Sequence, residues 1–126
     1  MIPSHEEAKE HTGVLEAAAD AARRTPGVAY LRPGFGDLVR GAAVRYRSRG
    51  AGAPPASRIA GVRAQRTGPP HGWSLRIHLA VARGHRALDV TRAVRAAVTT
   101  AVRELPTAGG APAPQVSVTI TVTDIV

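Results

Sequence analysis

The stretch WSLRIHLAVARG, residues 73–84, decides the fold because its side chains alternate in character. One set of alternate positions is apolar: Trp73, Leu75, Ile77, Leu79 and Val81. The other set contains the polar side chains: Ser74, Arg76 and His78, followed by Ala80 and Ala82. A period of two residues is typical of a β-strand that buries one face and exposes the other. The sequence therefore predicts that Arg76 and His78 lie on the solvent face of a sheet.

Two further segments predict strands that accompany it. Residues 58–67 alternate weakly, and the turn GPPHG at 68–72 leads from them into the opening stretch, which predicts a β-hairpin over 58–83. The final stretch QVSVTITVTDIV alternates without interruption, with Val116, Val118, Ile120 and Val122 inward and Ser117, Thr119, Thr121 and Thr123 outward. The sequence leaves open whether this hydroxyl ladder adjoins Arg76 and His78.

The first helix is predicted over residues 4–24. Ser4 and Glu7 have the spacing of a capping box, and Arg23 and Arg24 suit the negative end of the helix dipole. Gly13 weakens the middle of this segment, so we expect the regular helix to begin near Thr12. The TPG triplet at 25–27 ends it, and VAYL at 28–31 is long enough for a short strand.

A second helix is predicted over residues 89–105, with Asp89 as its N-cap. Its polar face carries Arg92, Arg95 and Arg103. Its apolar positions recur at helical spacing: Val90, Ala93, Val94, Ala97, Val98, Ala101, Val102 and Leu105.

This order of elements predicts an α+β fold. We expect a two-layer sandwich, in which a small, mostly antiparallel sheet carries two helices on one face and exposes the other. The 126 residues suffice for one domain over 1–126, with a flexible loop rich in Pro, Gly and Arg at about 41–57.

The chain carries a formal net charge of +8, and sixteen of its seventeen basic residues are arginines. Such a charge favours acidic partners. Arginine in place of lysine, with abundant Ala, Gly and Pro, is also typical of a GC-rich bacterial genome, so the charge has two explanations. The densest positive patch is RYRSRGAGAPP, where Arg45, Arg47 and Arg49 surround Tyr46. These three arginines, with Arg76 and His78, form the candidate interaction surface.

No motif predicts catalysis. The absence of cysteine excludes disulfides, thiol nucleophiles and cysteine-ligated zinc. The histidines and carboxylates show no spacing of metal ligands or of an acid–base pair, and no phosphate-binding loop, dinucleotide fingerprint or G-x-S-x-G motif occurs. We expect a protein that is not an enzyme, with no catalytic residue, metal, cofactor or small-molecule substrate. The polar N-terminus MIPSHEEAKEH predicts a cytoplasmic location.

A family resemblance extends over about residues 12–126. A helix followed by TPGV, a Gly-rich loop, WSLRIHLAVARGHRALDVTRAVRAAVTTAVREL and the terminal QVSVTITVTDIV together resemble the alkaline shock protein family of envelope stress response proteins. The resemblance implies a small α+β domain without catalytic residues. It also implies a cytoplasmic protein, in some members held at the inner face of the membrane by a membrane-anchored partner and linked to envelope homeostasis in Gram-positive bacteria.

Three classes of partner follow from these observations. The resemblance favours a membrane-anchored protein, with contact between the arginines and anionic lipid headgroups. The alternative is nucleic acid, bound through phosphates without sequence readout by the arginine-rich loop and the sheet face. The third is a second copy of the chain, paired along an unprotected edge of the sheet.

Overall fold

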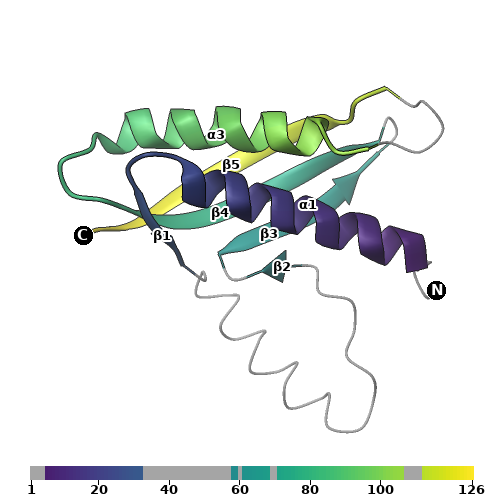
Figure 1. Ribbon diagram of the computed structural model, residues 1–126, viewed down its shortest axis with the longest axis horizontal. Coiled ribbons are helices and arrows are strands. Elements are labelled where there is room, and N and C mark those ends of the chain that lie inside the picture. The colour runs from purple at the N-terminus through teal and green to yellow at the C-terminus, as the bar shows by residue number, and fades with distance from the viewer. Residues whose placement is uncertain (1–4, 33–57, 60, 69–70, 107–111) are drawn as a thin grey trace, which may run out of the picture.

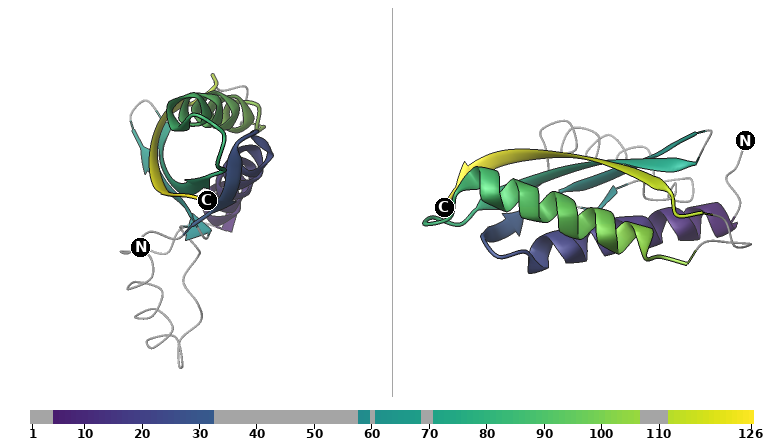
Figure 2. Two further views of the ribbon diagram at one scale, coloured as in Figure 1. Left: turned by 90° about the vertical axis from the view of Figure 1, so that its left-hand side faces the viewer. Right: turned by 90° about the horizontal axis from the view of Figure 1, so that it is seen from above.

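A computed structural model describes residues 5–32, 58–59, 61–68, 71–106 and 112–126. The elements follow the order α1 (His5–Arg24), β1 (Val28–Leu31), β2 (Arg58–Ile59), β3 (Val62–Thr67), β4 (Gly72–Val81), α3 (Ala87–Arg103) and β5 (Gln115–Ile125). Figure 1 shows both helices in front of the sheet, and the end view in Figure 2 shows them on its concave side. The predicted two-layer α+β sandwich is confirmed.

The opening stretch forms β4, the central strand of the sheet. One edge of β4 pairs antiparallel with β3 from Gly72 to Ile77 and with β1 from Leu79 to Val81. Its other edge pairs with β5 over its whole length, and this pairing is parallel. A parallel neighbour requires a crossover connection, which α3 provides. The sheet is therefore mostly antiparallel, as predicted, with one parallel strand at its rim.

The core is thin and aliphatic, as the scarcity of aromatic residues predicts. The inward side chains of β4, with Val62 of β3 and Val118 of β5, are buried against both helices. On α3 the buried side chains are the four valines at intervals of four residues: Val90, Val94, Val98 and Val102. Ala93, Ala97 and Ala101 were predicted on the same apolar face, but they line a groove between α3 and α1 instead.

The first helix predicted over residues 4–24 is confirmed over its described part, His5–Arg24, but two finer predictions of where the helices begin are wrong. Helix α1 is regular from His5 and passes through Gly13, because the burial of Val14 and Leu15 outweighs the roughly 1 kcal/mol cost of a helical glycine. Helix α3 begins at Ala87 with Arg86 as its N-cap, so Asp89 lies within the first turn. Packing of Ala87 against the core accounts for the additional residues. Ser4 of the expected capping box lies outside the described residues.

The predicted strand over 58–67 is two strands. Gly61 turns the chain between β2 and β3 with φ of 84°. A Cβ at this position would lie 2.8 Å from Leu31 Cβ and 2.9 Å from the Arg32 amide nitrogen. Only glycine combines this backbone conformation with so close an approach to β1. The predicted hairpin is confirmed between β3 and β4, whereas the flexible loop predicted at about 41–57 lies outside the described residues.

Candidate functional site

Arg76 and His78 lie where the alternation predicts, on the face of the sheet turned away from the helices. We call this surface the outer face; it comprises Arg63 and Gln65 of β3, Ser74, Arg76 and His78 of β4, and Ser117, Thr119 and Thr121 of β5. In the parallel register, Arg76 is paired with Thr119 and His78 with Thr121. The hydroxyl ladder therefore adjoins the two predicted residues, which decides a question that the sequence left open.

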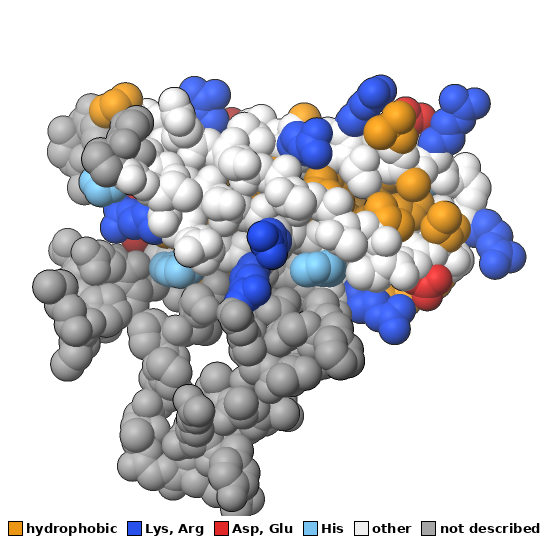
Figure 3. Space-filling view, turned by 180° about the vertical axis from the view of Figure 1, so that it is seen from behind, with side chains coloured by type: hydrophobic (Ala, Val, Ile, Leu, Met, Phe, Trp, Pro, Cys, Tyr) orange, Lys and Arg blue, Asp and Glu red, His pale blue; other side chains and the backbone are white. Residues whose placement is uncertain are grey.

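Two arginines face one another on the outer face. Arg63 of β3 is directly opposite Arg76 of β4 in the antiparallel register. Like charges directly opposite one another on a sheet repel, and both guanidinium groups are donors that a phosphate or a carboxylate can accept from. Figure 3 looks onto this side and shows basic side chains near its centre, within an otherwise mostly uncharged surface. The geometry favours contact with a phosphate or a carboxylate.

His78 is tied to two loops through its backbone. Its amide donates to the Gly61 carbonyl at 2.8 Å, and its own carbonyl accepts a hydrogen bond of 2.8 Å from the Arg32 amide. The imidazole Nδ1 is buried and has no hydrogen-bond partner among the described residues. His78 thus sits at the junction of β1, the β2–β3 turn and β4, while Arg76 is the exposed member of the pair.

A basic cleft of about 460 Å³ runs beside β3. Its walls are His11, Arg63, Ala64, Gln65, Arg66, Ser74 and Arg76, so it joins the outer face to helix α1. His11 donates from Nε2 to the Ala64 carbonyl at 2.9 Å and packs edge-on against Trp73 at 5.3 Å between ring centroids. Arg66 lies over the same indole, 5.7 Å from its centroid, and forms an ion pair with Glu10 at 3.1 Å.

The structure does not test the other three predicted site residues. Arg45, Arg47 and Arg49 lie outside the described residues. Of the five residues of the candidate interaction surface, the structure therefore brings together two, Arg76 and His78, and adds Arg63 beside them.

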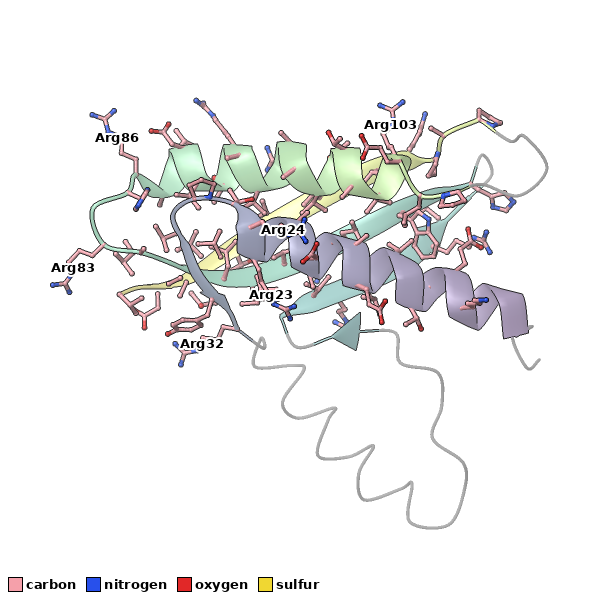
Figure 4. All side chains as sticks on the ribbon, in the orientation of Figure 1. Arg23, Arg24, Arg32, Arg83, Arg86 and Arg103 are labelled. Atoms are coloured by element: carbon pink, nitrogen blue, oxygen red, sulfur yellow. The ribbon has the colours of Figure 1, made fainter. Side chains whose placement is uncertain are left out.

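The sequence reasoning missed a second surface, which we call the basic end. It comprises Arg32, Arg83 and Arg86 together with the exposed side chains of Tyr30, Leu88, Ile125 and Val126. Figure 4 shows the three arginines projecting outward from one end of the molecule, opposite the end of α3 that carries Arg103. Among the described residues, these four apolar side chains are the only large ones that are exposed.

Backbone pairing assembles the basic end from three distant parts of the chain. Tyr30 of β1 is paired with Ala80, which is in turn paired with Asp124 of β5. The Arg83 amide donates to the Val126 carbonyl at 2.6 Å, and Arg32 forms an ion pair of 3.4 Å with Asp124. In the described part of the chain, Arg83 and Arg86 form no ion pair.

One signal for this surface was present in the sequence. Leu88 is a large apolar residue directly before the helix predicted over 89–105, outside its apolar stripe, and it is 61% exposed in the first turn of α3. Tyr30, Ile125 and Val126 gave no such signal, because only the pairing of β1 and β5 with β4 brings them to the same end.

Two further observations concern the type of site. The described residues contain no group of three or more His, Asp or Glu side chains that could hold a metal ion. None of the helices described is both long and apolar enough to cross a membrane.

Comparison with known proteins identifies no matching family model, no matching curated protein and no matching solved structure. The resemblance to the alkaline shock family accordingly stays a prediction.

Proposed function

We propose that this protein is a non-enzymatic interaction module that acts at the cytoplasmic face of a membrane through a protein partner, in the cell-envelope stress response or homeostasis. The observation that carries the proposal is the basic end. There, the exposed side chains of Tyr30, Leu88, Ile125 and Val126 belong to the chain segments that also carry or contact Arg32, Arg83 and Arg86. Exposed apolar side chains with cationic neighbours at one end of the molecule suit a partner surface close to anionic headgroups, where each arginine contributes about 1 kcal/mol.

The resemblance supports the cellular part of this proposal. Its quoted segments correspond to the end of α1 with its TPGV turn, and to β4, α3 and β5 in that order. These elements carry the basic end: the TPGV turn leads into β1, the β4–α3 connection contains Arg83 and Arg86, and β5 ends at Ile125. The segments that suggest the family therefore include Arg83, Arg86, Leu88, Ile125 and Val126 of the proposed contact surface.

The test is binding of the purified chain to membrane vesicles from its host that have been stripped of peripheral proteins and treated with nuclease. We expect the protein to sediment with these vesicles, and to lose binding when they are first treated with protease. Binding that survives protease treatment, or equal binding to protein-free vesicles of anionic lipid, would contradict the protein partner.

A pair of matched variants locates the contact. Arg83→Gln/Arg86→Gln removes two charges from the basic end, whereas Lys9→Gln/Arg103→Gln removes two exposed charges elsewhere on the helices. We expect the first variant to lose most of the bound fraction and the second to retain it. Equal losses would show that only net charge matters.

Nucleic-acid binding is the second candidate, and the outer face favours it. Arg63 and Arg76 face one another there, beside a row of hydroxyl groups that can donate to phosphate oxygens. We expect such binding to weaken steeply as salt rises, and Arg76→Gln to reduce both the affinity for a single-stranded oligonucleotide and its salt dependence, relative to Arg92→Gln. Release of the protein from host membranes by nuclease alone would favour this candidate over the membrane module.

A further inference from the structure

We infer that the free edge of β5 is an interface at which a second copy of this chain pairs through its own β5. Strand β5 spans 11 residues, Gln115–Ile125, and is bonded to β4 along one edge. In the part of the chain that the structure describes, no strand pairs with its other edge. A long unpaired edge presents a row of backbone donors and acceptors, which is a template for another strand.

Charge points to a second copy as the occupant. The chain has a net charge of +8, yet residues 104–126 contain no lysine or arginine, and the carboxylate of Asp124 is the single charge within β5. Two copies of a strongly basic protein repel one another over most of their surface, and least where cations are missing. Strand β5 also lacks the lysine and proline that commonly protect edge strands.

The partly buried aliphatic side chains of β5 also favour pairing with a second copy. Val116, Ile120 and Val122 point toward the helices and pack against the core, but all three keep part of their surface in solvent. Val118, in the middle of this row, is buried. A strand added beside β5 would remove the remaining aliphatic surface from water, which is a favourable contribution to association.

The pattern of β5 suits pairing with itself about a two-fold axis. Consider an antiparallel β5–β5 pair in which odd-numbered residues lie opposite odd-numbered residues. Ser and Thr then lie opposite Ser and Thr on the outer face, and Val and Ile lie opposite Val and Ile on the inner face. Such a pair is isologous, so the same residues serve both copies. The sheets of the two copies would then form one continuous sheet.

Arg95 of α3 is placed to oppose this pairing. Its Nε donates to the Val118 carbonyl oxygen at 3.3 Å, so a helix side chain occupies an acceptor of β5. A second strand must either displace the Arg95 side chain or pair with β5 without using the Val118 carbonyl as an acceptor. Arg95 therefore weakens self-association without preventing it, and its removal should strengthen the dimer. This inference does not depend on the proposed membrane role.

The test is sedimentation equilibrium of the full chain over a wide concentration range, at low and high salt. We expect a reversible monomer–dimer equilibrium that strengthens with salt, because screening reduces repulsion between the copies. Thr119→Glu introduces a charge at the interface, and Gln65→Glu introduces the same charge on β3 of the same outer face. We expect the first to raise the dissociation constant by about tenfold or more and the second to change it little.

A second pair of variants keeps the test independent of folding defects in β5. Arg95→Met should lower the dissociation constant, and Arg92→Met, on the exposed face of the same helix, should lower it less. A monomer at every concentration for both the parent chain and Arg95→Met would overturn the inference. Equal effects of Thr119→Glu and Gln65→Glu would overturn it as well, since net charge rather than the β5 edge would then govern association.

Discussion

The outer side of β3, which the two-residue strand β2 pairs only at Val62 and Arg63, and the free edge of β5 have different contacts with the rest of the chain. At the β3 edge, His11 of α1 donates to the Ala64 carbonyl and Glu10 of α1 pairs with Arg66, while Trp73 contacts both His11 and Arg66. At the β5 edge, α3 supplies Arg95 to one carbonyl of an 11-residue strand. The basic, covered edge discourages strand pairing, whereas the cation-free, open edge permits it.

This difference shows that sheet edges are protected by contact with a helix as well as by their own sequence. Strand β3 carries arginines that a second copy would repel, and it is also the strand that α1 covers. Strand β5 carries hydroxyl and aliphatic side chains, and the helix above it reaches the edge with one guanidinium group. Four predictions test how far each edge depends on these contacts, beginning with the largest expected effect.

Gly61→Ala should disrupt the β3 edge most severely. The new Cβ would meet Leu31 and the backbone of Arg32, and Gly61 has a positive φ that alanine adopts only with strain. We expect a loss of about 2 kcal/mol or more in the free energy of unfolding, measured by urea denaturation. Gly84→Ala is the matched control: its φ is 97° but nothing lies within 4 Å of the new Cβ, so about 1 kcal/mol is expected. If Gly61→Ala and Gly84→Ala lowered the free energy of unfolding equally, the close approach of β1 to the β2–β3 turn would be refuted.

His11 and Arg95 are the two helix side chains that bind edge carbonyls, and replacing each of them should show how much stability each edge gains from its helix contact. His11→Ala removes a partly buried hydrogen bond and the ring contact with Trp73, so we expect it to cost about 1 to 2 kcal/mol of stability. Arg95→Met removes a longer contact of an exposed side chain, and its stability should change by less than about 0.5 kcal/mol while dimerisation increases. If Arg95→Met is the more destabilising of the two in urea denaturation, the ranking of the edges is wrong.

Arg66→Gln should have a smaller effect at the β3 edge. Its ion pair with Glu10 is about half exposed, and its position over Trp73 adds a weak cation–π contact. We expect a loss of no more than about 1 kcal/mol, decreasing with salt. Arg24→Gln breaks the more exposed pair with Asp20 and should cost about 0.3 kcal/mol. Thermal unfolding at two salt concentrations would rank the two variants, and a larger effect of Arg24→Gln would contradict the role given to Trp73.

Much of the fold was predictable because local patterns determine it. The alternation in β4 and β5 and the helical period of α3 gave the elements and their buried faces, and the outward position of Arg76 and His78 followed from alternation alone. The parallel pairing of β5 was not predictable, since it depends on the path that α3 takes across the sheet. The adjacency of Thr119 to Arg76 is set by that same path.

The contact surfaces were less predictable than the fold. The basic end joins residues from β1, the β4–α3 turn and β5, which are separated in sequence by tens of positions and have no common motif. Contact between His11 and Trp73 depends on the crossing of α1 over β3, a packing property without a local signature. In both cases tertiary packing, rather than residue spacing, creates the surface.

Disulfide trapping tests the open β5 edge most directly, because the chain contains no cysteine and each introduced thiol is unique. Single cysteines at Ser117, Thr119 and Thr121 sample the outer face of β5, and Gln65→Cys samples β3 of the same face. A disulfide requires Cα atoms roughly 4.4–6.8 Å apart, which antiparallel partners satisfy only near the two-fold axis. We expect rapid covalent dimer formation at one of the β5 positions, slower reaction at the other two, and little at Gln65→Cys. Equal, slow reaction at all four positions would show that the β5 edges do not meet with a two-fold axis at any of these three residues.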